Sequence, residues 1–391
     1  MKYFSAQYIF TNNGPPLKRG IITTDDDGTI INVEDTGGSL PERHSVTFFN
    51  GIIVPGFVNC HCHLELSVMK DRIPKGTGLG GFLAELNMTR STGIDDPGPA
   101  ASEGDKMMAD EGIVLCADIS NSSITFDIKK KSRIKYISLL EVYGIDPAGA
   151  GKRMYEIMKV AGAAEEAQLD WFLVPHSVYS VSLPLFRLLK EKSASNRVTS
   201  IHFMESEDEK SLLSDHSGPL MNAYELILSP SAVIMPAADH VTAVTEEMTS
   251  SGSLILVHNT FIGADQIRQL KKRKDLYYCL CPGSNIYISD TVPPLDLIIS
   301  EKCSIVIGTD SLSSNSQLSI LNELRIIQEE FPGTRLTDLI AWATINGARA
   351  LGAEDMTGSI EPGKKPGLVL IKDADLTGMK LLPSSSSVRL L

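Results

Sequence analysis

Two histidines at alternate positions, His61 and His63, close the apolar run at residues 51–59 and are the first residues that could do chemistry. In an extended strand, residues i and i+2 project from the same side, so both imidazoles can reach one metal ion. Cys60 and Cys62 are then expected to face the opposite side. An isolated His-x-His pair also occurs as ordinary hydrogen-bonded histidines, so the pair supplies only half of a metal site.

Three further polar residues follow short apolar or β-branched runs elsewhere in the chain. They are His202 after residues 199–201, His258 after residues 254–257, and Asp310 after residues 304–309. A parallel β/α barrel builds its active face from residues of this kind, which lie at the C-terminal ends of separate buried strands. The spacing therefore favours an active site assembled from distant parts of the chain.

The elements that must position these residues alternate along the chain. Eight segments are predicted to be strands: residues 53–59, 113–119, 135–140, 171–175, 198–201, 253–257, 277–280 and 304–308. Amphipathic helical patterns lie between or after them, as at residues 318–330 and 336–350. Such alternation predicts an α/β fold with a parallel sheet.

The motifs resemble those of the amidohydrolase superfamily. They are Pro55-Gly56-Phe57-Val58-Asn59-x-His61-x-His63, His202-x-x-Glu205, His258, Pro282-x-Ser284-Asn285 and Gly308-Thr309-Asp310. Within that superfamily the chain is most similar to the branch of chlorohydrolases and of deaminases acting on adenosine-like compounds, guanine and aminofutalosine. The resemblance implies a (β/α)8 TIM-like barrel over residues 53–355, and a small β-sandwich domain formed by residues 1–52 and 356–391.

The resemblance also implies the metal site. His61, His63, His202 and Asp310 supply three imidazoles and a carboxylate, which suit Zn²⁺ and would accept Fe²⁺ or Mn²⁺. Two-metal relatives need a bridging ligand, often a lysine on the fourth strand, and residues 174–180 contain no lysine. A single divalent ion is therefore expected.

Catalytic roles follow from the resemblance. Glu205 is expected to shuttle a proton from the attacking water to a ring nitrogen, His258 to hydrogen-bond that water, and Asp310 to orient it while ligating the ion. An exposed glutamate at a helix start is the alternative for Glu205, because acidic residues 207–209 follow it.

Substrate contacts are expected from Glu65 and His176, with a loop histidine bonded to backbone as the alternative for His176. Asp118, Glu141 and His216 are further candidates without a unique partner. The glycine-rich residues 76–81 are interpreted as an active-site lid or loop.

The expected function is metal-dependent hydrolytic deamination of an amino-substituted heterocycle, in which metal-bound hydroxide attacks and ammonia leaves. An adenine-like or guanine-like base is expected, with aminodeoxyfutalosine as the specific candidate. One alternative is a chlorohydrolase or alkylamine-releasing hydrolase of a triazine-like ring. Another is a noncatalytic binding protein that keeps the barrel without the metal.

Composition sets limits on partners. The net charge of −12 disfavours binding to nucleic acid or to anionic lipid. Residues 1–10 lack the unbroken apolar segment of a signal peptide, so a cytoplasmic enzyme is expected. Cys60-x-Cys62 and Cys279-x-Cys281 could suggest zinc thiolates, but buried apolar packing is favoured. A small heterocycle is the expected partner, and a homodimer is left open.

Overall fold

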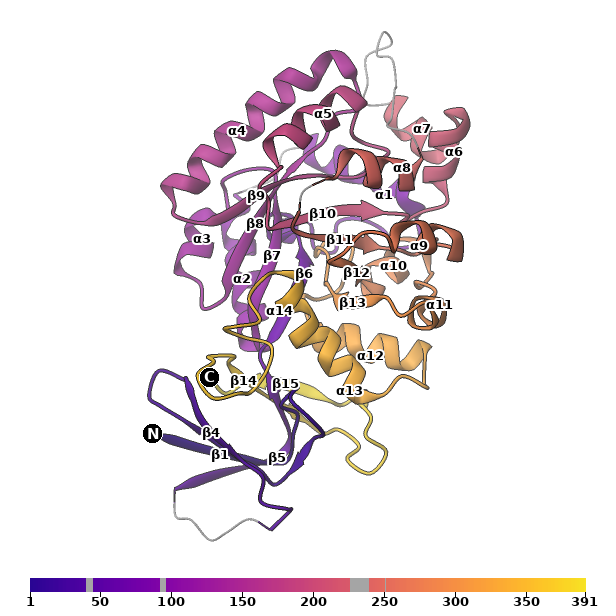
Figure 1. Ribbon diagram of the computed structural model, residues 1–391. Helices are drawn as coiled ribbons and strands as arrows, with labels where there is room; N and C mark the ends of the chain where they lie inside the picture. Colours follow the sequence, from indigo (N-terminus) through magenta and orange to yellow (C-terminus); the bar gives the residue numbers. More distant parts are fainter. Residues whose placement is uncertain (40–44, 92–95, 226–238, 250) are drawn as a thin grey trace.

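The computed structural model describes residues 1–39, 45–91, 96–225, 239–249 and 251–391, and places a barrel beside a sheet built from both chain ends (Figure 1). No helix in these ranges is both long enough and apolar enough to cross a membrane.

Eight parallel strands form the barrel in sequence order. One run of four comprises β6 (Phe57–Cys62), β7 (Ile113–Ser120), β8 (Lys135–Val142) and β9 (Asp170–Pro175). The other comprises β10 (Val198–Phe203), β11 (Ser253–His258), β12 (Leu276–Leu280) and β13 (Ser304–Ile307). Parallel bridges Ser177–His202 and Cys62–Asp310 join the two runs at both edges. This confirms the predicted (β/α)8 class, because the sheet closes on itself.

The first predicted barrel strand, residues 53–59, is divided in two. Residues 53–55 end β5 (Val46–Pro55), which pairs with β1 (Lys2–Ile9) and β14 (Leu368–Lys372), and β6 begins only at Phe57. The break falls at Gly56, whose N–H approaches the carbonyl oxygens of residues 366 and 367. A Cβ there would lie 2.4 Å from the Val114 side chain, so this close approach requires glycine.

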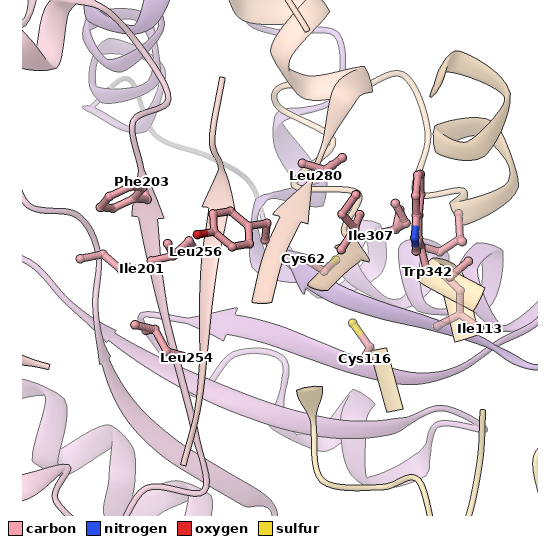
Figure 2. Packing of buried hydrophobic residues seen from close by; sticks show 14 of the residues in the cluster. Cys62, Ile113, Cys116, Ile201, Phe203, Leu254, Leu256, Leu280, Ile307 and Trp342 are labelled. Carbon is pink, nitrogen blue, oxygen red and sulfur yellow. The ribbon is translucent and has the colours of Figure 1, made fainter. Parts of the chain in front are cut away.

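The same strand contains a register shift against β7 between Asn59 and Cys62. Cys60 packs in a buried cluster with members from all eight strands, which fills the barrel interior. Cys62 instead packs with Cys116 and Met108 in the layer between strands and helices, part of which Figure 2 shows. The alternating pattern of the sequence predicts that Cys60 and Cys62 lie together, on the side of the strand opposite the two histidines. That prediction is wrong, because the bulge rotates the strand between the two cysteines.

Helices surround the barrel, as Figure 1 shows. They include α2 (Gly98–Asp110), α3 (Phe126–Lys131), α4 (Ala150–Glu166), α5 (Leu183–Lys192), α9 (Ala264–Leu270), α11 (Leu295–Ser300) and α12 (Ile320–Glu330). Ser319 caps α12 by accepting the Asn322 N–H, and the chain leaves the helix at Phe331, which precedes a proline. The predicted helix at residues 336–350 is divided into α13 (Leu336–Ala341), a π-helical turn (Trp342–Asn346) and α14 (Gly347–Ala350).

Both chain ends contribute to a second, seven-stranded sheet. Its order is β15 (Ser386–Arg389), β14, β5, β1, β3 (Ile21–Thr24) and β4 (Ile30–Glu34), with β2 (Leu17–Lys18) paired to β1. Hydrogen bonds connect these strands into one continuous sheet. The predicted domain boundary at residues 52–53 falls inside β5, and the division into two domains stays a prediction.

Candidate metal centre and active site

Four predicted metal ligands converge at the C-terminal ends of β6, β10 and β13. The Nε2 atoms of His61 and His63 lie 3.1 Å apart, and Asp310 Oδ1 lies 3.5 Å from the first and 3.4 Å from the second. One donor atom from each of these residues and from His202 lies within 4.8 Å of all the others. All four residues are buried.

These separations fit a tetrahedral ion. Zn²⁺ binds nitrogen and oxygen ligands at about 2.0–2.1 Å, which places adjacent tetrahedral ligands roughly 3.3 Å apart. The observed 3.1, 3.4 and 3.5 Å separations match that edge length. Burial lowers the pKa of His63 well below its usual value, and the charge of neighbouring His61 lowers it further. Two imidazole nitrogens that face each other at 3.1 Å favour a cation between them.

Surrounding hydrogen bonds orient the ligands. The Nδ1 atom of His202 donates to the His176 carbonyl at 2.9 Å, which leaves its Nε2 free to bind an ion. The hydroxyls of Ser284 and Ser314 each donate to Asp310 Oδ2 at 2.6 Å, while Oδ1 faces the histidines. Although burial alone would raise the pKa of Asp310, the adjacent histidines hold that pKa well below its ordinary range. The carboxylate is thus ionised and fixed in orientation.

Glu205 and His258 lie together beside this cluster. Glu205 Oε1 is 3.6 Å from His258 Nε2, and both side chains are buried. The amide of Asn285 donates to His258 Nδ1 at 3.2 Å, so the ring proton resides on Nε2, toward Glu205. Burial lowers the pKa of His258 to about 3, and so the ring is neutral.

The protonation state of Glu205 suits an acid. Burial raises its pKa well above the usual carboxyl value, and the negative charges of Asp310 and Glu209 raise it further. A cation bound nearby would favour the ionised form instead. The group can therefore hold a proton in one state and release it in another. Its burial also removes the alternative of an exposed glutamate at a helix start.

A cavity of about 220 Å³ opens onto the cluster. His63, His202, Glu205 and Asp310 contribute to its polar wall, together with His176 and Glu141. Its apolar wall comes mainly from α1 (Gly78–Ser91) and α7 (Pro219–Glu225), through Leu79, Phe82, Leu83, Leu86, Leu220 and Ala223. The site can therefore hold a ligand with a reactive polar end and an apolar body.

The glycine-rich residues 76–81 are only partly a loop. Helix α1 begins at Gly78, and its Leu79 lines the cavity. A Cβ on Gly80 would lie 2.7 Å from the Pro219 carbonyl carbon, so this glycine permits α1 to pack against α7. The prediction of a lid or loop is corrected to a helix start that forms part of the cavity wall.

The two predicted substrate contacts lie in different environments. His176 lines the cavity, and its Nδ1 interacts with the hydroxyls of Ser177 at 3.0 Å and Ser180 at 2.7 Å. Glu65 is not among the lining residues, because its carboxylate accepts the backbone N–H groups of Asn121 and Ser122. Its direct contact with a substrate stays a prediction.

Sequence reasoning missed several residues of this site. Ser314 holds Asp310, and its only sequence signal is the serine-rich stretch after that aspartate. Asn121 lines the cavity and donates to Glu141 Oε2 at 3.2 Å. Of the further candidates, Glu141 also lines the cavity, whereas Asp118 is paired with Lys129 and His216 is exposed.

The family model described as "Amidohydrolase family" matches residues 161–386, which is more than half of the chain. The chain belongs to the amidohydrolase family. Amidohydrolases are typically metal-dependent hydrolases, and this one contains the group of three histidines and one aspartate that could hold an ion.

Three relatives show what this amidohydrolase is similar to. The adenosine deaminase of Helicobacter pylori is 26% identical over 340 residues, covering 84% of this chain and 80% of that protein. Aminofutalosine deaminase of H. pylori, solved with methylthio-coformycin, matches with a TM-score of 0.82 at 22% identity, covering 100% of both chains. Atrazine chlorohydrolase of Arthrobacter aurescens, solved with zinc, matches at 0.75 and 15% identity, covering 98% of this chain and 91% of that one. These two structural matches establish the fold.

Proposed function

We propose that this amidohydrolase is a metal-dependent hydrolytic deaminase that releases ammonia from an amino-substituted, adenine-like or guanine-like heterocycle. The observation that carries the proposal is the convergence of His61, His63, His202 and Asp310 beside the buried Glu205–His258 pair. The sequence relative named adenosine deaminase supports the reaction type.

The four clustered residues would hold one divalent ion. Their nitrogen and oxygen donors and their tetrahedral edge lengths support Zn²⁺, with Fe²⁺ or Mn²⁺ as alternatives. A bound ion would supply a nucleophile by lowering the pKa of a coordinated water from 15.7 to about 7.

The protein's own residues then manage the protons and the developing charge. Glu205 would take a proton from the attacking water and pass it to the ring nitrogen next to the attacked carbon, and would then move the proton of the new hydroxyl group to the amino group, which leaves as ammonia. Neutral His258 would donate from Nε2 to the oxygen on which charge develops, and Asn285 holds the ring in that tautomer. Asp310, fixed by two serine hydroxyls, would orient the attacking water.

We propose aminodeoxyfutalosine as the specific substrate within this class. The structural relative named aminofutalosine deaminase and the long apolar wall of the cavity support a base that carries an extended substituent. His176 would contact the substrate from the cavity wall. A cytoplasmic location and a homodimer stay predictions.

A test panel separates this proposal from its alternatives. Metal-loaded protein would be incubated with aminodeoxyfutalosine, adenosine, 5′-methylthioadenosine, guanine and atrazine, while ammonia and chloride are measured. Ammonia from a purine substrate supports deamination. Chloride from atrazine with no ammonia would favour the chlorohydrolase alternative, since atrazine chlorohydrolase shares this fold. No turnover and no bound metal would favour a binding protein.

A further inference from the structure

The Glu209 carboxylate lies behind Glu205, outside the cavity wall. It is fully buried in the first turn of α6 (Asp208–Asp215). Its Oε1 accepts two successive backbone N–H groups, from Glu205 at 2.6 Å and from Ser206 at 3.0 Å. The side chain therefore fixes the backbone that carries the proposed proton shuttle.

The chain needs this support because it turns sharply after β10. Met204 adopts φ of +50°, a left-handed conformation that is unusual for a residue with a side chain. Such positions persist only where the surroundings hold them, and they cluster at functional sites. The turn leaves Glu205 on the cavity wall. Glu209 accepts the backbone N–H groups of Glu205 and Ser206, the two residues that follow Met204.

A second partner comes from a distant segment. The Nε2 atom of His240, in α8 (His240–Thr242), lies 2.6 Å from Glu209 Oε2. The His240 ring also meets the Phe203 ring edge-on at 5.6 Å, at the last residue of β10. Glu209 and His240 thus connect the end of β10, α6 and α8 around the turn.

Helix capping alone does not account for this arrangement. A glutamate in a first turn often reaches back to a free N–H, but it can do so at the surface. A buried carboxylate is costly unless its oxygens are hydrogen-bonded, and in Glu209 one oxygen accepts two backbone N–H groups while the other contacts His240. The buried Glu209 carboxylate is therefore better explained by the backbone geometry that it holds in place than by helix capping alone.

We propose that Glu209 and His240 form a positioning pair that holds the Glu205 backbone so that its carboxyl group faces His258. This inference rests on the proposed function, since it assigns the pair a role in the same reaction. The pair acts through Glu205 and touches neither substrate nor ion.

The test compares Glu209→Met, which removes both acceptor oxygens, with Glu209→Gln, which retains one. The control is Glu207→Met, because Glu207 is exposed and its carboxylate lies 3.7 Å from the ammonium group of Lys210. We expect Glu209→Met to lower kcat by about 10- to 100-fold, since a misplacement of roughly 1 Å can cost about 100-fold. KM should stay within about threefold and the bound ion should be retained, because no substrate or metal contact changes. Glu209→Gln should recover most of the loss.

Two further measurements separate positioning from a general structural role. In a Glu205→Gln background, Glu209→Met should lower kcat no further, because its effect passes through Glu205. Hydrogen exchange of the Glu205 and Ser206 amides should be slow in the wild type and fast in Glu209→Met, without any need for activity. If Glu209→Met does not fold, His240→Asn should show faster exchange of the same amides and a kcat loss of about tenfold.

The outcomes are distinguishable. Wild-type kcat in Glu209→Met, an undiminished effect in the Glu205→Gln background, or unchanged amide exchange would overturn the positioning pair. A wild-type protein that releases no ammonia from any purine in the panel would overturn the proposed function, and the exchange measurement would still decide whether the pair holds this backbone.

Discussion

Replacing Lys129 by Met should destabilise the protein strongly, although the residue lies in a run of three lysines. The Lys129 side chain is fully buried, and its Nζ lies 2.7 Å from Asp118 Oδ2. It also donates to the hydroxyls of Ser120 at 2.7 Å and Ser138 at 3.1 Å. Methionine keeps most of the apolar stem but removes the charge, so Asp118 would remain buried without its counter-ion.

Removing one partner of a buried ion pair costs about 3–5 kcal/mol of unfolding free energy. The matched control is Lys130→Met, because Lys130 is exposed and should change stability by less than about 0.5 kcal/mol. The assay is urea unfolding of metal-free protein, followed by the fluorescence of Trp171 and Trp342. Asp118→Asn added to Lys129→Met should restore part of the loss, since it removes the uncompensated charge.

The consequence extends to the metal centre. Asp118 Oδ1 accepts the backbone N–H of Leu64 at 2.7 Å, directly after the ligand His63. Weaker metal binding should therefore accompany the lower stability in Lys129→Met. Equal urea midpoints for Lys129→Met and Lys130→Met would refute the reasoning.

Three other predictions concern the site itself. Glu205→Gln should retain the ion but lose about 10²- to 10⁴-fold in kcat for ammonia release, because the amide cannot shuttle protons; near-normal turnover would contradict the shuttle role. His63→Ala should lose both the ion, by elemental analysis, and turnover; an ion retained at full stoichiometry would show that the ligand is wrongly assigned. Burial lowers the pKa of His176 to about 4 and that of His258 to about 3, so in the metal-free protein each ring destabilises the fold at pH 5 relative to pH 7.5, whereas the raised pKa of Glu205 acts in the opposite direction. Between pH 7.5 and pH 5, the free energy of unfolding in urea should therefore change in favour of His176→Asn over the wild type by on the order of 2 kcal/mol, and the same pH dependence in both proteins would contradict this.

The strands and the ligand positions could be predicted because both depend on local patterns. Each buried strand is a short apolar run, and a polar residue at its C-terminal end lies on the same face of the barrel as the others. His61, His202 and Asp310 therefore converge as the sequence indicated. The bulge that separates Cys60 from Cys62 could not be predicted, because it depends on pairing with β7.

Other features depend on partners that are distant in the sequence. Nothing local distinguishes Lys129 from Lys130. The difference arises because Lys129 is on the buried face of α3, where it meets Asp118 on β7. The acidic run at residues 207–209 is typical of an exposed segment, yet Glu209 is fully buried, because His240 and two backbone N–H groups satisfy its carboxylate. Such pairings become visible only once the fold brings the segments together.

The most direct test of the account is the metal content of protein purified without chelator, measured together with ammonia release. We predict one divalent ion per chain, loss of that ion on alanine substitution of either His202 or Asp310, and turnover that rises in proportion as Zn²⁺ is restored to metal-free protein. Protein with no bound transition metal and no gain of activity with Zn²⁺ or Fe²⁺, or full occupancy in both alanine variants, would contradict it.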